Sequence, residues 1–162
     1  MILALAAVLA LADTTRPTTV IVVRHAEKAA LPANDPVLSP EGIERALALD
    51  SALVNAGVTT VITTPFTRTR ATAAPVAQRH GVRPLELPVR GGVAAHAREI
   101  ADSARARGGV VLVVGHSNTV GHIVEALGGP KVGDLPDTEY RSLWTVTLDN
   151  EKVVVVRARF GR

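Results

Sequence analysis

Two uninterrupted runs of branched aliphatic residues constrain the fold of this chain more than any other feature of its sequence. They are TTVIVVR at Thr18–Arg24 and VVLVV at Val110–Val114. A strand with one face in water would alternate apolar with polar residues, and neither run does so. Both are therefore expected to be strands covered on both faces, which is typical of parallel sheets flanked by helices.

Segments with helical spacing separate these runs from further short β-branched runs. Strands are predicted at about Thr18–Arg24, Val58–Thr63, Arg83–Leu87, Val110–Val114, Tyr140–Leu148 and Lys152–Phe160. Helices are predicted at about Pro40–Ala56, Thr67–His80, Val93–Ala106 and Asn118–Leu127. Strands that alternate with helices build βαβ units. The chain is thus predicted to be a single α/β domain, a three-layer sandwich with helices on both faces of a mostly parallel sheet of about six strands.

Residues with known positional preferences mark the ends of two predicted helices. Ser39 suits the N-cap of the first helix, Pro40 its first position and Gly57 its C-cap. Pro75 is expected to end or kink the second helix. The buried face of the first helix is predicted to consist of Ile43, Ala46, Leu47, Leu53 and Val54.

Composition excludes several classes of function. The 18 basic residues barely outnumber the 15 acidic ones, they form no long run, and only 2% of the residues are aromatic. Nucleic acids are therefore not expected as partners. The absence of cysteine excludes disulfides, thiol catalysis and cysteine-based zinc sites.

The first twelve residues, MILALAAVLALA, are apolar and end in the A-x-A pattern that precedes signal-peptide cleavage sites. We predict a signal peptide at residues 1–12, a domain at residues 13–162 and an extracytoplasmic location, periplasmic or secreted. Twelve residues are too few to span a bilayer as a helix, so no stable membrane insertion is expected after processing. The alternative is a helical extension on a cytoplasmic protein.

Polar residues that follow the predicted strands are the candidates for function, because ligands of open α/β sheets bind beyond the carboxyl ends of the strands. Arg24 and His25 follow the first strand, Arg68 comes soon after the second, and His116 and Ser117 follow the fourth. Crowded cations repel one another unless an anion joins them. A phosphoryl group is the simplest such anion, because arginine binds phosphate through two parallel hydrogen bonds.

Backbone N–H groups at two predicted helix N-termini, Thr67 and Ser117, are expected to add to this anion site. Taken singly, the candidate residues also have structural explanations, since the two arginines could pair with Glu27 or Asp35. The phosphate-loop motifs GxGxxG and GxxxxGK[ST], the nucleophile elbow GxSxG and the zinc motif HExxH are all absent from the sequence.

Four motifs occur in a characteristic order along the chain. They are Arg24-His25 after the first strand, Leu38-Ser39-Pro40-Glu41-Gly42, Thr64-x-x-x-Arg68-x-x-x-Thr72-Ala73, and Gly115-His116-Ser117-Asn118-Thr119. In this order they resemble the motifs of the histidine phosphatase superfamily. The likeness is to its phosphoglycerate mutase-like branch and, given the short chain, to the short bacterial phosphatases of that branch.

The resemblance implies a phosphatase that hydrolyses phosphomonoesters through a phosphohistidine intermediate on His25. Arg24, Arg68 and His116 would hold the phosphoryl oxygens and stabilise the transition state, with Ser117 as a further phosphate ligand. A small phosphorylated substrate is implied, and neither a cofactor nor a metal ion is expected.

A proton donor for the leaving group is the remaining role, and a carboxylic acid with a raised pKa is the usual donor. Glu86 is our candidate because it ends the third predicted strand, at the same sheet edge as His25, and Asp35 is the rival. Two other functions stay open. One is a phosphate-binding pseudoenzyme of the same fold, and the other is a metal hydrolase that uses His25, His116 and His122.

Overall fold

The computed structural model describes residues 17–162, so the predicted signal peptide at residues 1–12 lies outside the described residues. The strands are β1 (Thr18–Arg24), β2 (Thr60–Thr63), β3 (Leu85–Glu86), β4 (Val110–Gly115), β5 (Ser142–Asp149) and β6 (Lys152–Arg159). The helices are α1 (Pro40–Ala52), α2 (Thr67–His80), α3 (Val93–Arg107) and α4 (Val120–Ala126). Across the described part of the chain, none of the helices is long and apolar enough to cross a membrane.

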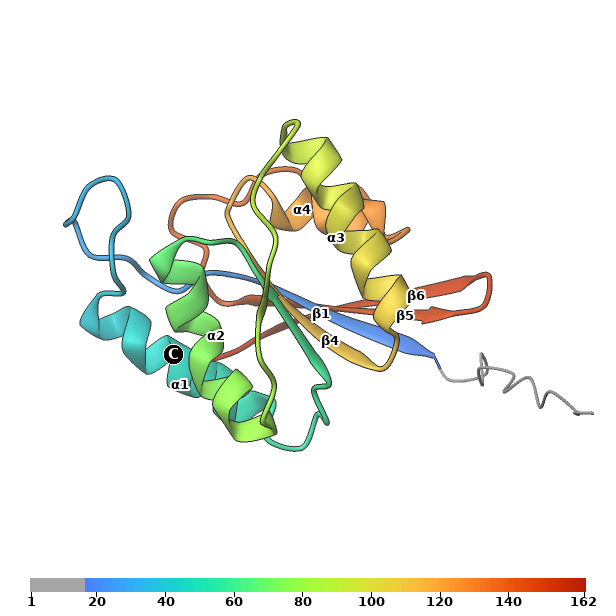
Figure 1. Ribbon diagram of the computed structural model, residues 1–162, viewed down its shortest axis with the longest axis horizontal. Coiled ribbons are helices and arrows are strands. Elements are labelled where there is room, and N and C mark those ends of the chain that lie inside the picture. The colour runs from blue at the N-terminus through green and yellow to red at the C-terminus, as the bar shows by residue number, and fades with distance from the viewer. Residues whose placement is uncertain (1–16) are drawn as a thin grey trace, which may run out of the picture.

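These elements form three layers around one six-stranded sheet (Figure 1). The strand order is β3-β2-β4-β1-β5-β6. Strands β3, β2, β4 and β1 are parallel, whereas β5 runs antiparallel to β1 and β6 antiparallel to β5. Figure 1 shows α1 and α2 on one face of the sheet and α3 and α4 on the other. The prediction of a three-layer α/β domain with a mostly parallel sheet is confirmed.

The central strand β1 is buried on both faces, as its uninterrupted aliphatic run predicted. Val20 and Val22 belong to the apolar core beneath α3 and α4, whereas Ile21 and Val23 belong to the core beneath α1 and α2. None of the four is more than 4% exposed. Because successive side chains of a strand point to opposite faces, a strand between two cores needs an apolar residue at every position.

The predicted buried face of α1 and its following turn is partly wrong. Ala46 and Leu53 are buried as expected, but Ile43, Leu47 and Val54 are 55%, 54% and 46% exposed. These three residues form a stripe that faces solvent, next to the buried face of the helix.

Gly42 explains how α1 is rotated about its axis. A Cβ atom at this position would overlap the carbonyl oxygen of Glu27, so only glycine allows the helix to lie against the loop after β1. Gly42, Ala46, Leu49 and Leu53 are buried and are spaced four, three and four residues apart, which places them on one helix face.

Several element boundaries differ from the predicted ones. Helix α1 ends at Ala52, four residues early, and Gly57 with its φ of 66° closes the turns that follow instead of capping the helix. Helix α2 has its predicted bounds, so Pro75 does not end it. Strands β2 and β3 are shorter than predicted, and α4 begins only at Val120.

Candidate active site

The predicted phosphate-binding side chains converge at one end of the sheet. Arg24 at the end of β1 pairs with Gly115 at the end of the neighbouring parallel strand β4. His25 continues this ladder, since its N–H donates to the Gly115 carbonyl at 2.9 Å. The ring of His116, the next residue after β4, lies with its centroid 5.4 Å from that of His25. Arg68 approaches them from the first turn of α2.

His25 is only 3% exposed, and its Nδ1 lies 2.8 Å from the carbonyl oxygen of Ala26. A carbonyl can only accept, so Nδ1 carries the hydrogen and Nε2 keeps its lone pair. Burial, together with the charges of Arg24, Arg68 and Lys28, lowers the pKa of His25 to about 4, although the hydrogen bond to Ala26 acts to raise it. At neutral pH the ring is therefore a neutral imidazole with an unprotonated Nε2.

His116 is held in the other tautomer, with its hydrogen on Nε2, by a chain of hydrogen bonds. Nη2 of Arg68 lies 3.4 Å from its Nδ1, and a guanidinium can only donate. Nε2 of His116 therefore carries the hydrogen and donates to Oγ1 of Thr64 at 2.9 Å, which in turn lies 2.9 Å from Oγ1 of Thr69. Burial, followed by the influence of His25 and Arg68, lowers the pKa of His116 to about 3. His116 is thus also neutral at pH 7.

Arg24 connects the nucleophile candidate to the loop between α4 and β5. Its Nη1 donates to the carbonyls of Pro136, Asp137 and Glu139 at 2.9, 3.0 and 3.1 Å. Its Nη2 donates to the hydroxyl of Tyr140 at 3.3 Å, and the guanidinium lies 4.0 Å from the centre of that ring. Its Nε is buried and has no hydrogen-bond partner among the described residues. Arg24 therefore fixes the loop and still presents one N–H group without a partner.

Arg68 presents a second buried N–H group of this kind. Its guanidinium lies 4.4 Å from the ring centre of Phe66, and its Nη1 lies 3.8 Å from the carboxylate of Asp35. Its Nε is buried and, within residues 17–162, has no hydrogen-bond partner. Burial lowers the pKa of Arg68, whereas the negative charge of Asp35 acts to raise it. The guanidinium stays charged. Buried donors in folded proteins nearly always have partners, and an oxyanion would satisfy both arginines.

These side chains line an open pocket of about 540 Å³. Three of its lining residues are cationic and one is a carboxylate, so the pocket has an excess of positive charge. Its lining consists of Arg24, His25, Lys28, Phe66, Arg68, Val89, His116, Ser117, Asn118, Thr119 and Asp137.

Two of the sequence motifs hold the loop that follows His25. Oγ1 of Thr72 accepts from the N–H of Ala26 at 2.9 Å and donates to the carbonyl of Arg68 at 2.7 Å, so it ties this loop to α2. The hydroxyl of Ser39 caps α1 by accepting from the N–H of Gly42 at 3.2 Å. The motif residues outside the pocket thus fix the position of His25 relative to Arg68.

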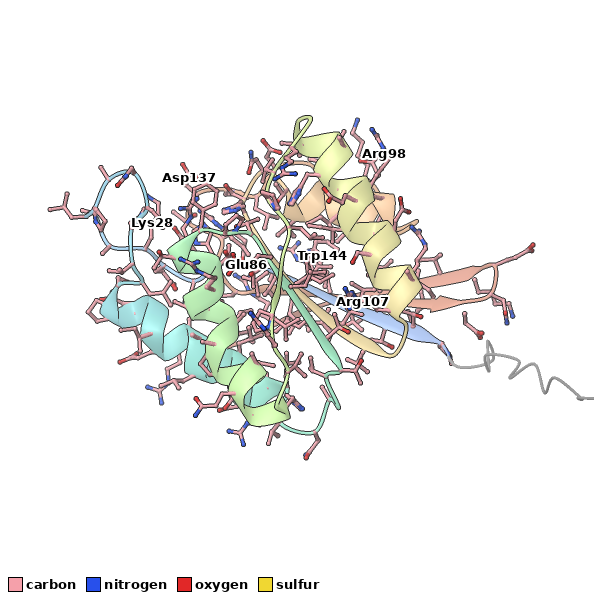
Figure 2. The ribbon with its side chains drawn as sticks, viewed as in Figure 1. Lys28, Glu86, Arg98, Arg107, Asp137 and Trp144 are labelled. Carbon is pink, nitrogen blue, oxygen red and sulfur yellow. The ribbon has the colours of Figure 1, made fainter. Side chains whose placement is uncertain are left out.

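Neither predicted proton donor lies in this pocket. Glu86 forms an ion pair with Arg70 at 3.5 Å and lines a different pocket with it, and Figure 2 shows Glu86 beside α2. Glu86 does end β3 at the same end of the sheet as His25, but β3 is the outermost strand and is separated from β1 by β2 and β4. Asp35 accepts from the N–H and the hydroxyl of Thr67 at 2.9 and 2.7 Å. These bonds, with nearby Arg68, lower the pKa of Asp35, which favours the ionised form.

The helix N-termini contribute fewer free N–H groups than predicted. The N–H of Thr67 donates to the carboxylate that caps α2. At α4, the N–H groups of Thr119 and Val120 both donate to the carbonyl of His116 at 3.0 Å. Ser117 lines the pocket as expected, but it lies in the turn before α4 instead of starting the helix. Of the two predicted helix N-termini, the one at Thr67 therefore has its first N–H group already occupied.

The residues of the alternative metal site are not brought together. His122 lies on α4, 3.7 Å from Asp134, and does not line the pocket that holds His25 and His116. In the part of the chain that the structure describes, no three histidine or acidic side chains are grouped so that they could hold a metal ion.

Tyr140 is the pocket neighbour that the sequence analysis missed. Its ring centroid lies 6.2 Å from that of His25, and its hydroxyl accepts from Arg24. It follows a predicted helix and loop and belongs to no motif, so its position depends on the tertiary path of the loop. Lys28 and Phe66 were also given no role, although each lies within three residues of a motif residue.

We expect the ring of His25 to stay neutral down to pH 5 and to take up a proton only near pH 4, because its pKa is lowered to about 4. An NMR titration of the imidazole signals, assigned with the His25→Ala variant, measures this directly. The folded-state pKa lies below the unfolded value of about 6.5, so the unfolded chain binds more protons between these pH values. Folding stability should therefore fall as pH decreases from 6.5 to 4, and less steeply in His25→Ala. A His25 midpoint near 6.5 would contradict this account of the site.

Comparison with known proteins places this arrangement in context. Residues 20–90 match the sequence model of the histidine phosphatase superfamily, branch 1. This span includes His25 and Arg68. A search of curated proteins found no match.

Several solved structures share the fold. The structure of the protein histidine phosphatase SixA complexed with tungstate is 21% identical, with a TM-score of 0.70 over 87% of this chain and 96% of that one. Phosphoglycerate mutase from Bacillus anthracis is 15% identical, with a TM-score of 0.68 over 89% of this chain and 93% of that one. YhfR of Bacillus stearothermophilus is 18% identical, with a TM-score of 0.67 over 86% of this chain and 95% of that one.

Proposed function

We propose, from the match of residues 20–90 to the histidine phosphatase superfamily, that this chain is a member of that superfamily and a metal-independent phosphatase that transfers the phosphoryl group of a phosphomonoester to His25 and then to water. One observation carries the proposal. The buried His25 has a free Nε2 in the same pocket as Arg24 and Arg68, whose buried Nε groups have no partner within residues 17–162. Enzymes accelerate phosphoryl transfer mainly by positioning the groups and stabilising charge, and these residues supply both.

In the first step the lone pair of Nε2 attacks phosphorus, and the bond from phosphorus to the leaving oxygen breaks. The Nδ1–H group of His25 donates to the Ala26 carbonyl, which stabilises the positive charge that develops on the ring. Arg24, Arg68 and His116 bind the phosphoryl oxygens, and the negative charge of that group favours protonation of His116. In the second step water attacks phosphorus, the P–N bond breaks, and its electron pair returns to Nε2.

The pocket favours leaving groups that depart without taking up a proton. Among the described residues, the one carboxylate that lines it is Asp137, and that side chain is 99% exposed. A carboxylic acid that donates a proton to a leaving group is usually buried, whereas Asp137 is exposed. Aryl phosphates have such a leaving group, and so does phosphohistidine, which is named for a SixA phosphatase of similar fold.

We expect kcat/KM for 4-nitrophenyl phosphate to exceed that for ethyl phosphate by about 10²- to 10⁴-fold, the usual contribution of a general acid. Glu86→Gln should leave both values within about twofold, because the side chain pairs with Arg70 outside the pocket. The measurement is initial-rate kinetics with a series of aryl and alkyl phosphates. A selective loss of alkyl phosphate turnover in Asp137→Asn would show that Asp137 donates the proton.

Release of phosphate from 4-nitrophenyl phosphate tests the proposed function most simply. Activity is expected to survive exhaustive chelation, because Arg24 and Arg68 supply the positive charge that a metal ion provides in other phosphatases. Activity that disappears on chelation and returns with one divalent ion would contradict metal independence. If the folded protein released no phosphate from any member of a phosphometabolite panel, the pseudoenzyme alternative would replace the proposal.

A further inference from the structure

Lys28 differs from the other cations that line the pocket. Arg24 lies 3.9 Å from the carboxylate of Asp137, and Arg68 lies 3.8 Å from that of Asp35. Lys28 lines the same pocket, but its ammonium group forms no ion pair or hydrogen bond with residues 17–162. Its charge also acts on His25, whose pKa it helps to lower. The excess positive charge of the pocket is therefore concentrated at Lys28.

The backbone directs Lys28 towards the pocket. The N–H of Ala29 donates to Val37 at 2.8 Å, and the bridge between Lys28 and Leu38 makes this a short extended segment. Successive side chains of an extended segment point to opposite sides. The side chain of Glu27 points to α1, where Arg45 holds it with hydrogen bonds of 2.6 to 2.8 Å. Lys28 therefore faces the other way, into the pocket.

Lys28 lies at the mouth of the pocket rather than at its floor. His25, Arg24 and His116 are 3%, 5% and 7% exposed, whereas Lys28 is an exposed residue. Figure 2 shows Lys28 and Asp137 at the same end of the molecule. In an in-line transfer the leaving group lies opposite the attacking nitrogen, so it points away from His25 and towards this mouth.

We propose that Lys28 binds a second anionic group, carried by the leaving group of the substrate. This inference rests on the proposed phosphatase function and narrows its substrate class. The preferred substrates are phosphate esters whose leaving group bears a carboxylate or a further phosphate close to the transferred phosphoryl group. Arg24 and Arg68 can hold that phosphoryl group through their buried Nε–H groups, which leaves Lys28 for a second anion. A lysine ammonium is a compact charge on a flexible stem and suits an anion whose position varies between substrates.

Binding of two non-hydrolysable probes, phenylphosphonate and 3-carboxyphenylphosphonate, tests the proposal without requiring turnover. Isothermal titration calorimetry is expected to show that the wild-type protein binds the carboxylated probe about fivefold more tightly, the upper range for one exposed ion pair. In Lys28→Met the ratio of the two affinities should fall to about one, and Lys28→Arg should restore it in part. The matched control Lys152→Met, on the exposed strand β6, should keep the wild-type ratio. A third probe, 1,3-phenylenediphosphonate, shows whether phosphate is preferred to carboxylate.

Each result has a distinct meaning. A wild-type affinity ratio near one for both anionic probes, or a ratio that persists in Lys28→Met, would overturn the role of Lys28 and leave the phosphatase proposal intact. A wild-type preference that Lys28→Met abolishes would support the anionic subsite even if the protein failed to hydrolyse aryl phosphates. The preference should also weaken at 0.5 M salt, about the concentration at which exposed charges are strongly screened.

Discussion

Replacing His25 with alanine is expected to reduce kcat/KM for 4-nitrophenyl phosphate by on the order of 10⁴-fold or more, as for removal of a covalent nucleophile in other enzymes. The variant loses the only protein atom that bonds to phosphorus in the proposed mechanism. Arg24, Arg68 and His116 remain, and they can only bind the phosphoryl group. Steady-state kinetics with a substrate in large excess measures the loss.

A matched histidine provides the control. His122→Ala should keep activity within about twofold, because His122 is partly exposed and pairs with Asp134 outside the pocket. Because His25 is buried, its replacement could also disturb folding, so His25→Asn, which is closer in volume, serves as a second variant. Both His25 variants should show the same loss and a native circular dichroism spectrum. Similar losses in the His25 and His122 variants would contradict the assignment of the nucleophile.

Arg68→Ala is expected to cost on the order of 3 kcal/mol in transition-state stabilisation, which is about 150-fold in kcat/KM. Arg68 is held between the Phe66 ring and the ring of His116, and its buried Nε lacks a partner among the described residues. It can therefore bind oxygens of the phosphoryl group as negative charge develops on them. The loss should appear mainly in kcat.

Arg70→Ala is the matched control, because it removes the same side chain from the same helix. Arg70 is two residues further on, which turns it roughly 200° around the helix axis. Its guanidinium is half exposed and pairs with Glu86. Activity should stay within about threefold of the wild type, as for the loss of an exposed ion pair. Comparable losses in Arg68→Ala and Arg70→Ala would show that the phosphate site does not have the geometry described above.

The sequence was sufficient to predict the sheet and to predict that the carboxyl ends of β1 and β4 lie close together. The bounds of β1 and α2 are those predicted, because an aliphatic run between two cores and a helix ended by Gly81 leave few alternatives. Arg24, His25 and His116 were placed together correctly, since neighbouring parallel strands end at the same edge. The local sequence and the general rule for α/β sheets were enough at these positions.

The errors arose where tertiary packing decides the outcome. Glu86 ends a strand as predicted, but the strand order, which the sequence does not encode locally, places that strand at the sheet edge. The rotation of α1 depends on the contact of Gly42 with Glu27, and the stripe of Ile43 and Leu47 therefore faces solvent. Tyr140 reaches the site through the tertiary path of its loop, where its hydroxyl accepts from Arg24.

The phosphoenzyme is the most direct measure of the central claim that His25 carries the phosphoryl group. The protein is mixed with a radiolabelled aryl phosphate, quenched in alkaline denaturant within milliseconds, and digested for peptide mass spectrometry. We predict a label that is stable in base, labile in acid, located on His25, and lost in His25→Ala. Label on another residue, or full labelling of His25→Ala, would contradict the account.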